Sequence, residues 1–549
     1  MAEKKANEIF KEFKEHSIAE FFKKNKQMLG YAGLVRSLVT VIHEYVTNSL
    51  DACEEAGILP DISVSISQNG ENRYVVEVID NGPGIPKKFA GKALATILAG
   101  TKFHRYIQQR GQQGIGAAGC TLFSQITTGK PVSMRSFTKD GEAYSCNIAI
   151  DTMGNKPVVT ETKDLQNSDN ITGTAIKGEF AEVKYENSEH GVYEYLKRTA
   201  LANPHAQIKF TDPEGKEYTF VRSSNAVPEL PKQTLPHPLG LSIMDVLDFA
   251  RRSQESSVAA FLMASFSRVS QGKVKELKDI ATDVDFSKNP KSVDWNDAEE
   301  LVKAFKKVKW LAPDASVIRP IGSDRVKLAV RSILNPEYMH VIERKPQVFK
   351  GGIPFIVEAA ISYGGSSGKK VGNDEYMGSI LRFANKVPLL FDTGSCAITQ
   401  AVRDIQWKRY GIDMDNQPVS VLVNISSVYV PYSGVGKEAV AQEDEIIEEI
   451  KLALQDAARN IQRYMHGKQQ VNVEKNKYKT IMRYVSQLSK DLGSLTGADK
   501  VVIRGKLEEL VTEHYPKVKG EEGEEQNDEE ETLEIVEHNA TEEEKEESE

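Results

Sequence analysis

The chain has 549 residues, of which 40% are hydrophobic and 27% are charged, which is enough for about two to four domains with ample core. Its four cysteines, Cys53, Cys120, Cys146 and Cys396, lack paired spacing, which argues against a zinc site or a disulfide framework and fits a reducing cytosol. The start leads to no apolar signal segment, and no run of about 18 apolar residues occurs. These features predict a soluble, cytoplasmic protein that does not enter a membrane.

Charge is distributed unevenly along the chain. Residues 520–549 hold 16 Asp and Glu and one Lys, a net charge of −15, whereas the whole chain carries −9 and the remainder therefore +6. The acidic end has almost no apolar content, so we expect it to be disordered. The rest of the chain is mildly basic, which permits contact with DNA without demonstrating it.

The first motif is a carboxylate and an amide on one predicted helix. Ser17-Ile18-Ala19-Glu20 predicts an earlier helix start, and helical spacing then resumes in a second apolar set, Val35, Leu38, Val39, Ile42, Val46 and Leu50. Within that set Glu44 and Asn48 are spaced i, i+4 and share a face. Such a pair suits activation of a water and completion of the shell of a Mg²⁺ that also binds phosphate oxygens. Alone, it would more often be an ordinary polar helix face.

The second motif follows a predicted hairpin. Ile62, Val64 and Ile66 alternate with polar residues, a turn lies at 68–70, and a strand from 74 to 79 ends at Asp80. Gly82 and Gly84 leave room for a flat group beside the backbone. An ionised Asp80 would accept a hydrogen bond from an exocyclic amine such as that of adenine. Asp-Asn-Gly-Pro-Gly alone would be read first as a turn.

The third motif is the glycine-rich run Gly111-Gln112-Gln113-Gly114-Ile115-Gly116, with a helix expected to start near Ala117. Its backbone N–H groups suit anionic oxygens. Residues 114–119 also match a dinucleotide-binding pattern, but residues 106–110 read poorly as the buried strand which that pattern requires. Residues 364–369 fall one residue short of a Walker loop. The three motifs together, in this order, predict an ATP site.

These motifs resemble the boxes of the GHKL ATPase superfamily, which includes type II topoisomerases, MutL, the ninety-kilodalton heat-shock chaperone and histidine kinases. The stretch from Gly100 to Gly116 and Pro431-Tyr432-Ser433-Gly434-Val435-Gly436-Lys437-Glu438-Ala439 resemble a narrower family, the B subunits of topoisomerase VI. Arg382-Phe383-Ala384-Asn385-Lys386-Val387-Pro388 and residues 407–411 look like that family's transducer. The resemblance covers about residues 1–515.

The resemblance implies an α+β multidomain protein. We expect a Bergerat-type GHKL ATPase α/β sandwich with an N-terminal dimerisation segment at 1–230 and a helix-two-turns-helix domain at 231–312. A transducer with a long helical arm is expected at 313–515, and a disordered acidic tail at 516–549. The pattern predicts helices at 243–249, 258–266, 298–307 and from near Lys437 to about Tyr515. It predicts strands at 132–137, 144–150, 173–176, 353–361, 387–391 and 419–428.

The resemblance also implies roles for individual residues. Glu44 would be the catalytic base, Asn48 would bind Mg²⁺, and Asp80 would read adenine. Thr101 and Lys102 would belong to a lid over ATP, and Lys437 would be a switch lysine that reaches the γ-phosphate. The phosphates would be held by Gly111, Gln112, Gln113, Gly114, Ile115, Gly116, Ala117 and Ala118. Gly173-Thr174 resembles the last ATP box of the superfamily, although this signal is weak.

The implied activity is that of a type IIB DNA topoisomerase. Two B subunits would close as an ATP-operated gate and act with a DNA-cleaving A subunit, in an A2B2 assembly, on double-stranded DNA. The cutting chemistry is not expected in this chain, because Asp283/Asp285 and Asp413/Asp415 read as surface carboxylates. The alternative is a MutL-like or chaperone-like ATP clamp without strand passage. A histidine kinase is disfavoured, because His43 does not lie on a phospho-acceptor helix.

Overall fold

The computed structural model describes residues 24–27, 30–97, 106–111, 114–372, 375–434 and 436–514. The chain divides into two compact units, Met1–Ala458 and Arg459–Glu549, and each is considered by itself. The helix start expected at Ser17 and the acidic tail expected at 516–549 lie outside the described residues.

The first part of the first unit is built on a large, mostly antiparallel sheet. Its described strands number eight and run in the order β5-β4-β3-β6-β2-β1-β7-β8. They are β1 (Asp61–Gln68), β2 (Arg73–Asp80), β3 (Val132–Phe137), β4 (Ala143–Asp151), β5 (Lys156–Asp164), β6 (Gly173–Ala181), β7 (Gln207–Thr211) and β8 (Glu217–Phe220). The predicted hairpin is confirmed, since β1 pairs with β2 so that Ile62 faces Asp80.

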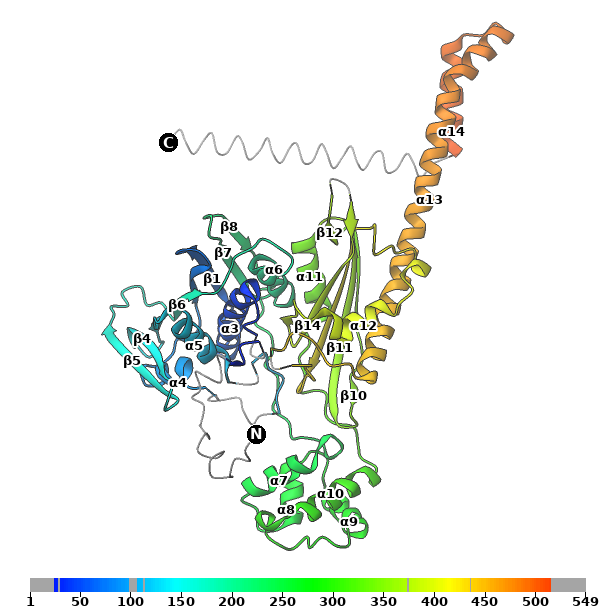
Figure 1. Cartoon of the computed structure of the whole chain (residues 1–549). Helices are drawn as coiled ribbons and strands as arrows, with labels where there is room; N and C mark the ends of the chain where they lie inside the picture. Colours follow the sequence, from blue (N-terminus) through cyan, green and yellow to red (C-terminus); the bar gives the residue numbers. More distant parts are fainter. Residues whose placement is uncertain are drawn as a thin grey trace, which may run out of the picture. The chain divides into compact units, whose positions relative to one another are not determined.

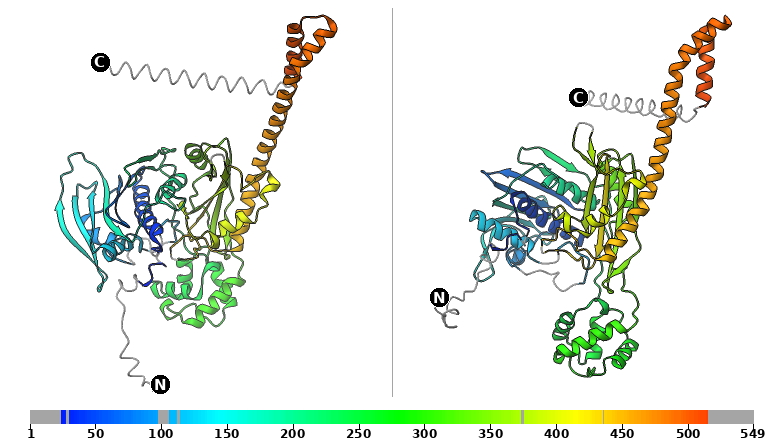
Figure 2. Two further views of the ribbon diagram at one scale, coloured as in Figure 1. Left: turned by 45° about the horizontal axis from the view of Figure 1, so that its top comes forward. Right: turned by 45° about the vertical axis from the view of Figure 1, so that its right-hand side comes forward.

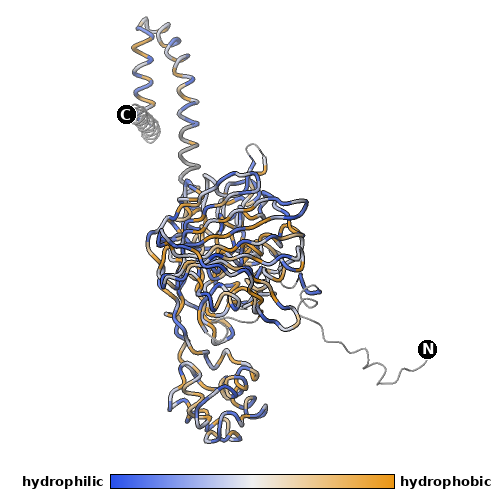
Figure 3. Tube along the Cα trace, turned by 90° about the vertical axis from the view of Figure 1, so that its left-hand side faces the viewer, coloured by the Kyte–Doolittle hydropathy of each residue, from blue (hydrophilic) through white to orange (hydrophobic). Residues whose placement is uncertain are grey.

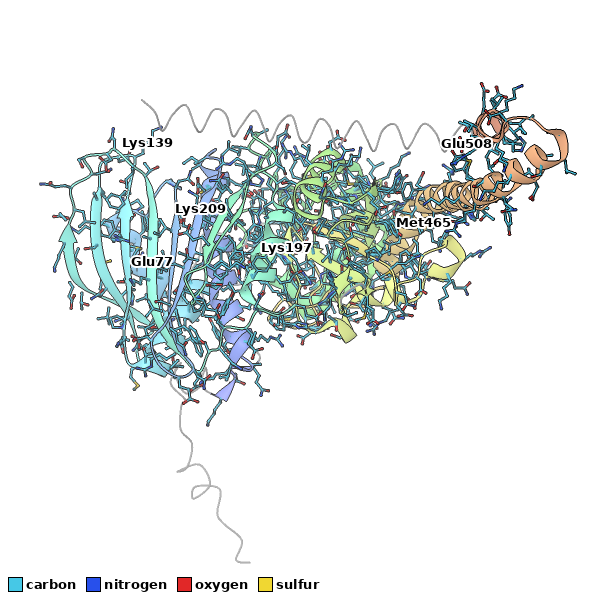
Figure 4. The ribbon with its side chains drawn as sticks, turned by 90° about the horizontal axis from the view of Figure 1, so that it is seen from above. Glu77, Lys139, Lys197, Lys209, Met465 and Glu508 are labelled. Carbon is cyan, nitrogen blue, oxygen red and sulfur yellow. The ribbon has the colours of Figure 1, made fainter. Side chains whose placement is uncertain are left out.

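Helices cover one face of this sheet (Figures 1 and 2). They are α3 (Leu34–Glu55), α4 (Ala90–Ala95), α5 (Gly116–Thr128) and α6 (Val192–Ala202). Alternate residues of β1 and β2 are buried beneath them, as the period of two requires. The other face carries charged pairs: Glu77 on β2, labelled in Figure 4, accepts a 2.9 Å hydrogen bond from Arg135 on β3. This two-layer arrangement places α3 and the start of α5 side by side.

A helical insert follows (Figure 2). Its buried apolar residues form a hydrophobic core of their own. Its helices are α7 (Ile243–Arg252), α8 (Val258–Ser265), α9 (Gln271–Ile280) and α10 (Trp295–Lys307). Two of them begin with reciprocal capping boxes, Ser242 with Asp245 and Asp294 with Asp297. The three helices expected here are confirmed, and α9 lies between them.

The next part of the first unit centres on a second sheet, in which the described strands run β10-β11-β16-β14-β15 with β9 on the side of β11. They are β9 (Tyr338–Glu343), β10 (Gln347–Phe349), β11 (Ile353–Tyr363), β14 (Ser379–Ala384), β15 (Val387–Pro388) and β16 (Val419–Ser427). The helices α11 (Ser323–Leu334) and α12 (Ala397–Arg403) accompany it. The strand expected at 387–391 is wrong beyond Pro388. A separate two-stranded hairpin pairs β12 (Lys369–Lys370) with β13 (Tyr376–Met377).

The long helix predicted near the end is confirmed as α13 (Asp444–Thr496), followed by α14 (Lys500–His514). It begins later than the sequence pattern predicts, because Lys437 has a φ of +54° and therefore lies outside helical geometry. In the second unit hydrophobic residues recur along these helices, as the colouring in Figure 3 shows. Several of them are exposed, among them Tyr484, Leu488 and Leu495.

The structure also describes the state of the cysteines and the apolar character of the helices. All four cysteines are buried and free, and burial raises the pKa of Cys53 to about 12 and also raises the pKa of Cys120. Within the ranges that the structure describes, no helix has both the length and the apolar character that crossing a membrane requires.

Candidate active site

The helix α3 and the start of α5 bring the first and third motifs together. Glu44 is partly buried on α3, and the amide of Asn48, one turn later, is exposed. Gly116, the first residue of α5, lies against the carboxylate of Glu44, and a Cβ at this position would overlap it. The glycine is therefore required by the close approach, and the carboxylate is held beside the predicted phosphate loop.

Asp80 is held by three donors at the end of β2. Ser49 on α3 donates to Oδ2 over 2.8 Å, and the backbone N–H groups of Gly82 and Thr174 donate to Oδ1 over 3.0 and 3.1 Å. Burial raises the pKa of Asp80, whereas these hydrogen bonds oppose the rise. The carboxylate is thus fixed in orientation, and an oxygen so placed can accept a further hydrogen bond from a bound amine.

The glycine-rich run leads into the N-terminus of α5, and none of the described side chains caps this end of the helix. The first N–H groups of a helix lack intrahelical partners and favour anions. The structure describes these members of the predicted phosphate loop: Gly111, Gly114, Ile115, Gly116, Ala117 and Ala118. Gly114 has a φ of +59°, which suits glycine. The remaining predicted contacts, Thr101, Lys102, Gln112 and Gln113, lie outside the described residues.

The structure brings Lys437 to this loop from far along the chain. Its Nζ donates to the backbone carbonyl oxygen of Arg110 over 3.4 Å, directly before Gly111. It also acts on His43 of α3: burial lowers the pKa of His43, Glu44 opposes that effect, and the charge of Lys437 adds to it. The ammonium therefore lies within electrostatic reach of both the loop and the helix that carries Glu44.

The available ligands are consistent with magnesium, although no group of three or more His, Cys, Asp or Glu among the described residues is arranged to hold a metal ion. Mg²⁺ keeps several waters and takes few protein ligands when it is bound together with phosphates. The exposed amide of Asn48, one turn from Glu44, fits that mode. A dedicated all-protein metal cage is not required.

Comparison with known proteins agrees with this geometry. Residues 33–151 match the family model described as histidine kinase-, DNA gyrase B- and HSP90-like ATPase, and residues 313–477 match the model of the topoisomerase VI B subunit transducer. The B subunit of type 2 DNA topoisomerase 6 from Methanothermobacter thermautotrophicus is 43% identical over 521 residues, covering 92% of this chain and 99% of the relative. The protein of the same name from Pyrococcus abyssi is 44% identical over 570 residues, covering 94% and 99% respectively.

The chain belongs to the family of topoisomerase VI B subunits. As a member of this family it carries the ATP-binding ATPase domain of a DNA topoisomerase. The fold expected from the resemblance, a GHKL ATPase followed by a transducer, is confirmed by the two family models and by the two sheets.

Three residues of this ATPase site were not singled out as site residues from the sequence. Ser49 and Thr174 orient Asp80, and Arg110 precedes the phosphate loop. For Thr174 the sequence did carry a signal, the weak resemblance of Gly173-Thr174 to the last ATP box. The structure supports that signal, because β6 pairs with β2 so that Thr174 lies opposite Asp80. Arg110 lies within the stretch from Gly100 to Gly116 that carries the family resemblance, but that resemblance assigned it no role. For Ser49 the sequence carries no signal, since its partner Asp80 is distant in the chain.

Proposed function

We propose that this chain is the ATP-operated B subunit of a type IIB DNA topoisomerase and that it works with a DNA-cleaving A subunit to pass one duplex through another. The observation that carries the proposal is the placement of Lys437 at the start of the phosphate loop and of Glu44 against Gly116 at its end. A lysine of the transducer that reaches the nucleotide loop provides a direct way for bound ATP to change the arrangement of the ATPase and transducer parts. ATP would act as a ligand with different affinities for two arrangements of the chain.

Each residue has a proposed task at the ATP site. Asp80 accepts a hydrogen bond from the amine of adenine, and backbone N–H groups from Gly111 to Ala118 bind the phosphates. Thr101 and Lys102 are assigned to the lid, and Gln112 and Gln113 to the loop, on the family resemblance alone. Asn48 binds Mg²⁺, which would neutralise phosphate charge when bound.

The chemical step is assigned to Glu44. Its carboxylate, placed beside Gly116, takes a proton from the attacking water as that water approaches the γ-phosphate. Lys437 donates to a γ-phosphate oxygen as a point charge and so links the nucleotide to the transducer. The closed arrangement would be a dimer of two copies of this chain, within an A2B2 assembly with the A subunit.

The proposed substrate is double-stranded DNA, and the outcome is relaxation of supercoils or unlinking of duplexes. The names of the relatives support this assignment, since each is a subunit of a type 2 DNA topoisomerase. The buried free thiols suit a reducing cytoplasm, where we propose the protein works.

The test is to mix the chain with a candidate A subunit, negatively supercoiled DNA, Mg²⁺ and ATP. We expect ATP-dependent relaxation, and none with the Glu44→Gln variant, which keeps the size of the side chain but removes the base. ATP-driven dimerisation without relaxation, in the presence of an active A subunit, would favour the clamp alternative and contradict strand passage.

A further inference from the structure

The three residues directly before the phosphate loop are hydrogen-bonded to residues of the transducer part. Gln108 exchanges two hydrogen bonds with the backbone of Arg319, donating over 3.0 Å and accepting over 2.6 Å. Asn385 Nδ2 donates to the carbonyl oxygen of Gln109 over 3.2 Å. Lys437 Nζ reaches the next carbonyl oxygen, that of Arg110. Transducer-side residues thus hold each of three successive positions.

The side chain of Arg110 is held by residues of the ATPase part. Its guanidinium donates to Asp51 over 2.7 Å and to both oxygens of Glu54 over 2.6 and 3.0 Å. A fourth hydrogen bond, of 2.6 Å, goes to Asn203 after α6. Arg110 is only 6% exposed, and its buried charge is compensated by these four hydrogen bonds. The planar guanidinium makes them in a fixed arrangement that the ammonium of a lysine could not reproduce. Asp51 and Glu54 lie on α3, the helix that also carries Glu44 and Asn48.

A buried lysine of the transducer completes this cluster. Lys386, 7% exposed, follows Asn385 in the turn between β14 and β15, where both residues have positive φ, 48° and 68°. Asn203 Nδ2 donates to the carbonyl oxygen of Lys386 over 3.1 Å. The charged groups that act on the Lys386 ammonium are Glu54 on α3, Arg110 before the phosphate loop, Glu358 on β11 and Arg325 on α11.

The buried charged groups of this cluster shift one another's pKa values. Burial would raise the pKa of Glu54, but Arg110, His205 and Lys386 outweigh burial and hold that pKa below its usual range. Burial lowers the pKa of Lys386 to about 8, whereas Glu54 opposes this effect. His205, whose ring lies 2.8 Å from Glu54, has its pKa lowered by burial.

We propose that Arg110 and Lys386 are positioning residues, and that residues 108–110 form a second link between transducer and phosphate loop, distinct from the contact of Lys437 with nucleotide. A movement of the 385–386 turn displaces the carbonyl of Gln109 and, through Arg110, the entrance to Gly111. Because the Arg110 guanidinium is fixed to α3, the same movement changes the loop relative to Glu44. The link transmits position in either direction and needs no contact with ATP.

This inference rests on the proposed function, because it concerns how ATP turnover is coupled to strand passage. The experiment uses the complex with its A subunit and compares wild type with Lys386→Met, Arg110→Lys and the matched control Lys327→Met. Lys327 is an exposed lysine of α11 that pairs with Asp324 one turn away. Three quantities are measured: the melting temperature, the Kd for a fluorescent ATP analogue, and the number of ATP molecules hydrolysed per strand passage.

We expect Lys386→Met to bind the analogue within about two-fold of wild type but to hydrolyse at least five-fold more ATP per strand passage. Arg110→Lys should show the same loss of coupling more strongly, because an ammonium cannot reproduce the four-bond fork. The control should match wild type. In wild type, coupling should weaken as pH rises through about 8 and Lys386 loses its proton, whereas Lys386→Met should be flat over that range.

The proposal would be overturned if folded Lys386→Met hydrolysed the same number of ATP molecules per strand passage as wild type. It would also be overturned if this number depended on pH in Lys386→Met as it does in wild type. A fall in melting temperature without a change in coupling would show a merely structural role. Since Arg110→Lys could fail to fold, the Lys386→Met result decides. If wild type itself fails to relax DNA with an active A subunit, the proposed function fails instead, and the two failures are thereby distinguished.

Discussion

The Cα of Gly116 packs against the carboxylate of Glu44, leaving no space for a methyl group between the start of α5 and the middle of α3. The position of the proposed catalytic base is therefore set by a residue that has no side chain. Any substituent there must push either the carboxylate or the helix start away from the other.

Gly116→Ala is accordingly expected to lower ATP hydrolysis by about 10²-fold or more, because misplacement of a catalytic group by about 1 Å has effects of this size. The matched control is Gly272→Ala, also in the first turn of a helix, where a Cβ would meet Ser270 Oγ at 3.8 Å. Steady-state hydrolysis and circular dichroism measure both variants. Normal turnover in a folded Gly116→Ala protein would contradict the close approach.

Asp80→Asn is expected to weaken ATP binding, because an amide cannot offer the same ionised acceptor to the amine of adenine. GTP should compete poorly with wild type, since its ring presents a carbonyl at that position. Burial raises the pKa of Asp80, so affinity for ATP should begin to fall on acidification at a higher pH than an ordinary aspartate would allow. Titration calorimetry from pH 4.5 to 8 measures this; an affinity independent of the Asp80 carboxylate would remove it from the site.

Lys437→Ala is expected to reduce ATP-driven closure of the dimer. A charge-assisted hydrogen bond contributes roughly 1.5–3 kcal/mol, so the closed-to-open ratio should fall by about one to two decades. Small-angle scattering with a non-hydrolysable ATP analogue gives this ratio. Lys451→Ala, which removes a partly buried lysine paired with Glu448 on α13, serves as the control. Undiminished compaction in Lys437→Ala would refute the switch assignment while leaving the ATP site intact.

Glu438, next to Lys437, gives a prediction for stability. Burial raises its pKa to about 7, although Arg36 opposes the rise. A carboxyl group with a raised folded-state pKa contributes stability that is fully present below its ordinary pKa and is lost as pH rises towards 7. The glutamine of Glu438→Gln stays neutral, so the melting temperature of this variant minus that of wild type should increase as pH rises from 5 to 7.5. Glu448→Gln, on an exposed helix face, should show no such trend; a constant difference for Glu438→Gln would contradict the buried titration.

The sequence predicts the ATPase elements well because their signals are local. The apolar spacing that surrounds Glu44 defines α3, and the alternation at Ile62, Val64 and Ile66 defines β1. β5 was missed because it is exposed at nearly every position and shows no alternation. The strand predicted from Val387 stops at Pro388, after a short pairing with β14.

The residues of the candidate site also fall into those that local sequence signals predict and those that they do not. Glu44, Asn48 and Asp80 follow from motifs that are contiguous in sequence, and Lys437 follows from a family motif. The cluster of Arg110 with Glu54 and Lys386 joins residues that become neighbours only when both sheets are in place. No local period or spacing reports such proximity, so the structure is needed to find it.

The burial of all four native cysteines makes the chain convenient for spectroscopy. The thiolate is the reactive form, and the pKa values of Cys53, Cys120 and Cys146 are raised mainly by burial. A maleimide dye should therefore react slowly with the folded wild-type protein and rapidly with one cysteine introduced at an exposed position. Fluorophores could then be attached to the ATPase and transducer parts without first replacing native residues, and the distance between them followed during turnover.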